Sequence, residues 1–199
     1  MMNTFRKHKL HEVASRPKHT LQFNEHTAPE DLQAIIDKLS TILNEARSEQ
    51  REAVYLCIGS DRYIGDSLGP LTGSLIMEKA GIPRVYGTLE EPIHAFNLKP
   101  ALKDIHKTYH NPLIICVDAS LGTKEQVGDV LFVDAPLMPG KALERMLPET
   151  GEYHFQGIVN YLDPLPTSQF LNDTRLHTVM KLSRLIAHVI TESEQQASQ

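Results

Sequence analysis

Two short apolar runs, each followed by an aspartate, constrain the fold of this chain more than any other feature. Residues 54–59 are mostly apolar and lead through a polar loop to Asp66, and residues 113–117 lead directly to Asp118. Apolar runs of this length, bounded by turn residues, are typical of buried strands. If the two runs are neighbouring parallel strands, their aspartates meet at the carboxyl edge of one sheet, where open α/β folds place their sites.

The rest of the chain alternates between strand and helix signals. The predicted strands cover residues 54–59, 84–89, 113–118, 127–133 and 154–159. The predicted helices cover residues 29–43, 67–80, 98–109 and 168–191, and the first follows a sequence of capping-box form, Thr27-Ala28-Pro29-Glu30. This order predicts an α/β fold of three layers, α/β/α, with a mostly parallel twisted sheet.

Length and composition predict one folded domain with short extensions. The chain has 199 residues, of which 41% are hydrophobic, and this is enough for a single large core. We expect a flexible N-terminal arm over residues 1–26, a single α/β domain over residues 27–194 and a disordered tail over residues 195–199. The arm is basic and rich in histidine; a processed pro-segment and a partner-binding tail are two alternatives for it.

Charge and hydropathy exclude several classes of protein. The formal net charge of −5 argues against a nucleic-acid binder, which needs a concentrated positive surface. No apolar run reaches the roughly 20 residues of a membrane-spanning helix, so we expect a cytoplasmic protein that does not bind membranes. Cys57 and Cys116 lie within apolar runs and are predicted to be buried, reduced thiols, since their spacing fits no zinc site.

Each aspartate has a structural alternative to a functional role. Asp66 could cap the helix that follows it, and Asp61 is a rival for the same functional role or the anchor of a local Asx turn. Asp118 could anchor its loop through the amides of residues 120–122. The loop over residues 59–70 lacks the glycine and lysine pattern of a phosphate-binding loop, so nucleotide binding is disfavoured.

Other polar residues are given their commoner structural interpretation. Glu90, Glu91 and His94 could border the same cleft, although a solvated loop is the more frequent position for such acidic residues. Exposure or a single hydrogen bond is expected for the four histidines on or beside the predicted helices, which are His106, His110, His177 and His188.

Four segments together resemble the sporulation protein YyaC family of spore-forming Firmicutes. They are Cys57-Ile-Gly-Ser-Asp-Arg-Tyr-Ile-Gly-Asp-Ser-Leu-Gly-Pro70, Val117-Asp-Ala-Ser120, His154-Phe-Gln-Gly-Ile-Val-Asn160 and Asn172-Asp-Thr-Arg-Leu-His177. The resemblance covers residues 30–190. It implies a fold related to the germination protease, which degrades small acid-soluble spore proteins, and to the hydrogenase maturation proteases, and so a phosphorylase/hydrolase-like α/β architecture.

The resemblance also implies roles for three residues. The germination protease has functional aspartates in motifs that match Asp66 and Asp118, although this chain has Gly65 and Ser67 where that family has proline and alanine. His154 matches a short histidine motif of the hydrogenase maturation proteases; its alternative is a position within a strand. The predicted site is therefore Asp66, Asp118 and His154.

The chemistry expected of this set is peptide hydrolysis by an acidic pair. Two close carboxyl groups do not both ionise readily, so one holds a proton and the other can activate water. The predicted function is a sporulation-associated peptidase, in the mother cell or forespore, that acts on a protein substrate such as a small acid-soluble spore protein. No cofactor is expected; a divalent metal and a homo-oligomer are left open. The alternative is a noncatalytic peptide- or metal-binding module on the same fold.

Overall fold

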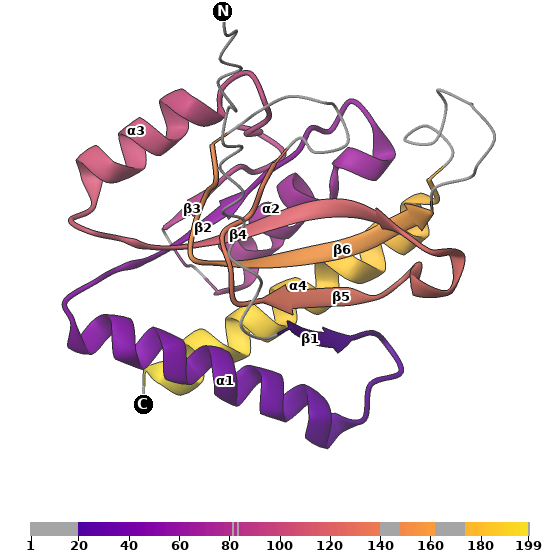
Figure 1. Ribbon diagram of the computed structural model, residues 1–199, viewed down its shortest axis with the longest axis horizontal. Coiled ribbons are helices and arrows are strands. Elements are labelled where there is room, and N and C mark those ends of the chain that lie inside the picture. The colour runs from indigo at the N-terminus through magenta and orange to yellow at the C-terminus, as the bar shows by residue number, and fades with distance from the viewer. Residues whose placement is uncertain (1–19, 81, 83, 140–147, 162–173, 199) are drawn as a thin grey trace, which may run out of the picture.

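A computed structural model describes residues 20–80, 82, 84–139, 148–161 and 174–198 of the chain (Figure 1). Its strands are β1 (Thr20–Phe23), β2 (Ala53–Cys57), β3 (Val85–Tyr86), β4 (Leu113–Gly122), β5 (Val130–Val133) and β6 (Tyr153–Tyr161). Its α-helices are α1 (Pro29–Ser48), α2 (Leu68–Ala80), α3 (Leu98–Thr108) and α4 (Leu176–Ala197). Two short 3₁₀ helices, η1 (Ile64–Asp66) and η2 (Lys124–Gln126), follow β2 and β4.

The six strands form one mixed sheet in the order β1-β5-β6-β4-β2-β3. β3, β2, β4 and β6 are parallel, whereas β5 runs antiparallel to β6 and β1 antiparallel to β5. The central strands are apolar on both faces, as expected for strands covered on both sides, and all five residues of β2 are buried. The predicted α/β fold with a mostly parallel sheet is confirmed.

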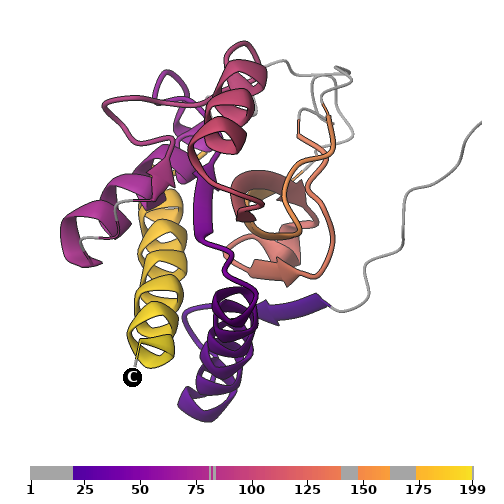
Figure 2. The ribbon, with the colours of Figure 1, turned by 90° about the vertical axis from the view of Figure 1, so that its left-hand side faces the viewer.

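Helices cover both faces of the sheet and give three layers (Figure 2). One core lies between the sheet and α1, α2 and α4, and it includes Tyr55, Val117 and Phe155. The second core is smaller and lies under α3, with Leu56 and Cys116 from the strands. Because successive side chains of a strand point to opposite faces, neighbouring residues of β2 and β4 contribute to different cores.

The long β4–β6 pair determines where the site lies. β2 pairs with β4 only from Ala53↔Leu113 to Cys57↔Val117, whereas β4 pairs with β6 as far as Gly122↔Tyr161. β4 therefore continues beyond the carboxyl end of β2, as Figure 1 shows. The predicted strand over residues 113–118 is correct but too short, since the polar residues after Asp118 are stabilised by pairing with β6.

The termini of the domain differ from the prediction. Residues 20–23 form β1, an edge strand that pairs with β5, so the expected flexible arm over residues 1–26 is wrong for this part; residues 1–19 lie outside the described residues. α4 continues to Ala197, so the expected disordered tail over 195–199 is wrong up to that residue. Both segments are ordered by tertiary contacts that local periodicity does not reveal.

The capping box predicted before α1 is also wrong. Pro29 takes the first helical position, but the Thr27 hydroxyl accepts a hydrogen bond from the Asn24 backbone amide instead of capping the helix. Within the described ranges, no helix is both long enough and apolar enough to cross a membrane.

Candidate active site

Asp118 lies on β4 directly after the last residue of β4 that pairs with β2. The Val117 carbonyl accepts the Ile58 N–H at 2.8 Å, and the next residue in β4 is Asp118. Its carboxylate Oδ1 accepts the backbone N–H of Ala119 at 2.9 Å. The loop-anchoring alternative through residues 120–122 is not what the structure shows, because those residues belong to the strand.

Asp66 comes from the loop that connects β2 to α2. It ends η1, and its backbone carbonyl accepts the Ser60 N–H at 3.0 Å, which closes the loop on itself. The carbonyl of Ser67 accepts the first helical bond, from Leu71, so Ser67 occupies the N-cap position of α2. The capping alternative for Asp66 is therefore wrong, and its half-buried carboxyl is left for another role.

Two glycines let this loop close tightly. Gly59 has φ +148°, and a Cβ there would lie 2.0 Å from the backbone oxygen of Asp66. A Cβ at Gly69 would lie 2.2 Å from the carbonyl oxygen of Ile58, so glycine is needed for α2 to approach β2. The motif around Asp66 thus has a structural explanation, which is to hold the aspartate against the carboxyl end of the sheet.

The two carboxyl groups are close enough to influence each other's ionisation. Burial raises the pKa of Asp66 to about 6, and the backbone amide of Ser60 opposes part of that rise. Burial also raises the pKa of Asp118 to about 8, with a further contribution from the negative charge of Asp66 and opposition from the Ala119 amide. At neutral pH the pair therefore holds one proton, mainly on Asp118.

His154 lies within β6 rather than at the edge with the acidic pair. It is 6% exposed, it pairs in register with Cys116, and its Nδ1 lies 2.7 Å from the carbonyl oxygen of Ala135. This position is two residues before that of Asp118, or about 7 Å along the strands. Burial lowers the pKa of His154. Its role as third member of the site stays a prediction.

Gln156 is the residue that sequence reasoning missed. It pairs in register with Asp118 and is half-buried, so its side chain leaves the neighbouring strand on the same face of the sheet as that of Asp118. The signal was present: two residues after His154 in a predicted strand, Gln156 lies on the same face and nearer the carboxyl edge.

The rival residues fall into two groups. Glu90 and Glu91 are exposed, as expected for a solvated loop, and Asp61, the rival of Asp66, is exposed as well. His94 is half-buried and follows Ile93, whose carbonyl accepts the Gly59 N–H at 2.7 Å, so it lies at the same edge of the sheet as the loop that holds Asp66. Its Nδ1 accepts the Phe96 N–H at 3.3 Å, which leaves the other nitrogen protonated in the neutral ring.

Cys57 and Cys116 are buried free thiols, as predicted, and burial raises the pKa of Cys57 to about 12. The four histidines on or beside helices are exposed, also as predicted, and one of them, His188, lies 3.7 Å from Glu192. In the described part of the chain, no group of three or more His, Cys, Asp or Glu side chains is arranged to hold a metal ion.

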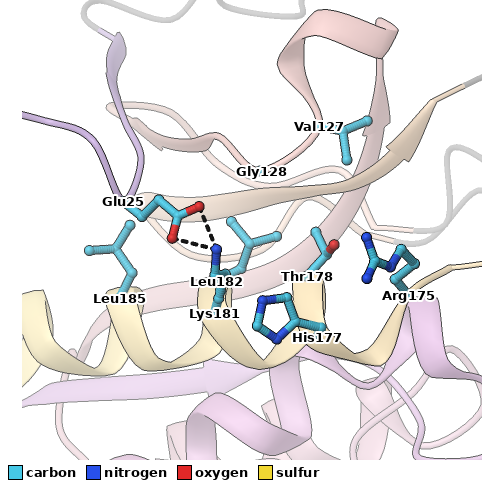
Figure 3. Close-up of a pocket in the computed structure, with 9 residues that line it drawn as sticks. All are labelled: Glu25, Val127, Gly128, Arg175, His177, Thr178, Lys181, Leu182 and Leu185. Atoms are coloured by element: carbon cyan, nitrogen blue, oxygen red, sulfur yellow. Dashed lines mark hydrogen bonds and ion pairs between the residues drawn. The ribbon is translucent and has the colours of Figure 1, made fainter.

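A separate pocket of about 190 Å³ lies between α4 and the loop before β5 (Figure 3). Its lining includes Arg175, His177 and Lys181, but Lys181 is already paired with Glu25 across the pocket. None of the predicted site residues lines it. This pocket is therefore distinct from the acidic pair.

A matching family and a sequence relative agree with the motifs. Residues 24–189 match the family described as "Protein of unknown function (DUF1256)". The uncharacterized protein YyaC of Bacillus subtilis (strain 168) is 39% identical over 184 residues, which is 92% of this chain and 86% of that protein. A solved structure, the [NiFe] hydrogenase maturation protease HycI from Thermococcus kodakarensis KOD1, is similar at 17% identity with a TM-score of 0.44, over 75% of this chain and 98% of that one. The resemblance to YyaC is thereby confirmed, and the chain belongs to the DUF1256 family.

Proposed function

We propose that this protein is a peptidase that hydrolyses a protein substrate with the acidic pair Asp66 and Asp118. The observation that carries the proposal is a pair of neighbouring carboxyl groups whose pKa values, about 6 and about 8, lie on either side of neutrality. Two titratable groups driven apart in this way are the arrangement needed for one base and one acid. Neither carboxylate forms an ion pair with another described residue.

The mechanism uses the protonation state expected at neutral pH. The Asp66 carboxylate takes a proton from water while the water oxygen attacks the carbonyl carbon of the peptide bond. Asp118 gives its proton to the leaving nitrogen as the carbon–nitrogen bond breaks, so the pair ends with the proton exchanged and returns to its first state through solvent. Gln156, beside Asp118, is suited to orient the carbonyl or the water through its amide.

We further propose a spore-forming cell as the setting and small acid-soluble spore proteins as the first substrates to test. The support is the motif resemblance together with the relative in a Bacillus. His154 lies two residues before the position of Asp118 along the strands, and its Nδ1 is within hydrogen-bond distance of the Ala135 carbonyl. We assign it no proton transfer.

The test compares hydrolysis of purified small acid-soluble spore proteins by the wild type, Asp66→Asn and Asp118→Asn, followed by mass spectrometry of the products. Each substitution should lower kcat/KM at least about 100-fold, the usual size of an acid or base contribution. Asp61→Asn is the matched control, because Asp61 is an exposed carboxylate in the same loop, and it should stay within about twofold of wild type.

Two results would overturn the proposal. Cleavage that survives both aspartate substitutions would exclude the acidic pair as the catalyst. Absence of cleavage by folded wild-type protein would favour the noncatalytic peptide-binding alternative.

A further inference from the structure

We propose that the substrate binds as an extended, unfolded segment that adds a strand to the open edge of β4, directly beside the acidic pair. The inference deepens the proposed function and rests on it, because it names the form in which a peptide bond reaches Asp66 and Asp118. The occupant is a stretch of protein backbone, recognised mainly through its amides and carbonyls.

The open edge exists because β4 extends beyond the end of its neighbour β2. On one side β4 is paired with β6 through Gly122, and on the other its pairing with β2 ends at Val117. Within the described residues, five positions of β4, 118–122, thus have a partner strand on one side alone (Figure 1). Unpaired strand edges are templates for another extended chain.

The alternation of the strand shows which backbone groups face this open side. Leu113 donates its N–H to Glu52, and the Val117 carbonyl accepts from Ile58, so odd-numbered residues of β4 point toward β2. The pairing of β4 with β6 shifts between Ser120 and Leu121, where it skips Val159, so the extra residue belongs to β6 and β4 keeps its own alternation. Ala119 and Leu121 therefore continue that series beyond the end of β2. The groups on the open side are therefore the N–H and C=O of these two residues.

Outside the β4–β6 ladder, two of these four groups have no recorded hydrogen bond to another described residue. The Ala119 N–H is taken by the Asp118 carboxylate at 2.9 Å, and the Leu121 carbonyl lies 3.4 Å from the Ser120 hydroxyl. The Ala119 C=O and the Leu121 N–H remain. An acceptor and a donor two residues apart on one side of a strand form the pair that one residue of an added strand requires.

The surroundings suit an extended peptide rather than a folded surface. The added strand would run next to Ala119, the residue after Asp118, so its backbone would pass beside the acidic pair. Tyr63, Ile64 and Phe96 are exposed apolar side chains in the loops that follow β2 and β3 at this edge, and Phe96 is 77% exposed. They offer contacts to the side chains of the added segment, which point alternately to the two faces.

The experiment uses peptides selected from a random dodecapeptide phage library by the full-length Asp118→Asn protein, which should bind without cleaving. The binding of these peptides is then measured for Leu121→Pro and Leu121→Ala, each made in the Asp118→Asn protein. Both variants lose the same side chain, but proline also removes the N–H that faces the open edge. Proline is tolerated at strand edges where no ladder bond is lost, and thermal unfolding checks that both variants are folded.

We expect Leu121→Pro to weaken binding roughly tenfold or more relative to Leu121→Ala, the effect of one lost hydrogen bond. The Leu121 amide should exchange more slowly with solvent when a peptide is bound, and N-methylation along the peptide should weaken binding at alternate residues. Equal binding by the two folded variants, unchanged exchange at Leu121 or failure to select any peptide would each overturn the inference. Hydrolysis that Asp118→Asn abolishes would still stand in those cases, so the proposed function would survive separately.

Discussion

The acidic pair and the carboxylate of Glu194 show two ways in which this fold holds a buried acid. Glu194, 7% exposed on α4, accepts the Tyr55 hydroxyl at 2.9 Å and an Arg47 N–H at 2.6 Å. Among the described residues, Asp66 and Asp118 have only backbone amides as donors, and the charge of Asp66 makes ionisation of Asp118 harder. Buried charge is costly unless donors or cations balance it, so the balanced acid is structural. The unbalanced pair sacrifices stability, which is typical of functional sites.

The contact with Glu194 also determines the ionisation of Tyr55. Burial, followed by the charge of Glu194, raises the pKa of Tyr55 well above its usual value. The phenol therefore stays a hydrogen-bond donor, and α4 is tied to the central strand. No comparable donor side chain serves the acidic pair among the described residues, which leaves its proton free to move.

The largest expected effect that separates the two regions is the pH dependence of hydrolysis. Below about pH 6 Asp66 becomes protonated and the base is lost; above about pH 8 Asp118 loses its proton and the acid is lost. Two pH units outside either limit, kcat/KM should fall about 100-fold. Initial rates from pH 4 to 10 test this, and a flat profile between pH 5 and 9 would contradict the assignment of base and acid.

The second effect is on stability and concerns Glu194. Glu194→Gln removes the charge that Arg47 and the Tyr55 hydroxyl require, so the free energy of unfolding should fall by about 2 to 3 kcal/mol. Urea denaturation measures this. Glu192→Gln is the control, because its side chain is 45% exposed with His188 at 3.7 Å, and it should change stability by less than about 0.5 kcal/mol. Equal losses of unfolding free energy for Glu194→Gln and Glu192→Gln would contradict the structural role of Glu194.

The third effect has the opposite sign and concerns Asp118. Its pKa is about 8 in the folded protein and about 4 in an unfolded chain, so between these values the folded state holds a proton that the unfolded state releases. The stability of the wild type therefore falls as pH rises from about 4 to about 8. Asn does not titrate, so Asp118→Asn should gain about 1 kcal/mol per pH unit relative to wild type between pH 5 and 8, measured by denaturation at both values. A constant difference between the two proteins would count against the raised pKa.

The smallest effect concerns Asp129, a second balanced acid. Its two carboxylate oxygens accept the side-chain amides of Gln22 and Asn24, which join the segment containing β1 to the start of β5. Asp129→Asn loses one acceptor, so stability should fall by about 0.5 to 1 kcal/mol, and amide exchange in β1 should quicken. Hydrolysis should not change, because β1 lies at the far edge of the sheet. Faster amide exchange at Asp118 instead of in β1 would contradict the prediction that Asp129 stabilises β1 and not the acidic pair.

Much of the central fold was predictable because its signals are local. The apolar runs of β2 and β4, the glycines before α2 and the stripes of the helices are each specified by neighbouring residues. β1 was missed because residues 20–23 are ordered through pairing with β5, more than 100 positions away in the chain. The cap of α1 was assigned wrongly because Thr27 has a nearer partner in the Asn24 amide.

The candidate site was predictable in part for the same reason. Asp66 was favoured over Asp61 by the residues that follow it, and the structure places Asp61 in solvent and Asp66 half-buried against the sheet. The pairing of Gln156 with Asp118 and the position of His154, two residues before Asp118, depend on the register between β4 and β6. Register is a property of paired strands rather than of either strand alone.

By itself, the sequence determined the alternation of strands and helices and the delivery of Asp66 and Asp118 to the ends of two apolar runs, because apolar periodicity and glycine positions act locally. Only the tertiary structure decided that the two carboxyl groups share one desolvated edge and that β4 continues past β2. Among the described residues, neither carboxyl group meets a cation there and no strand pairs with that part of β4 on the side of β2. Ionisation depends on all surrounding groups, and strand pairing depends on residues far apart in the chain. The proton on Asp118 and the open edge beside it are therefore consequences of the assembled fold.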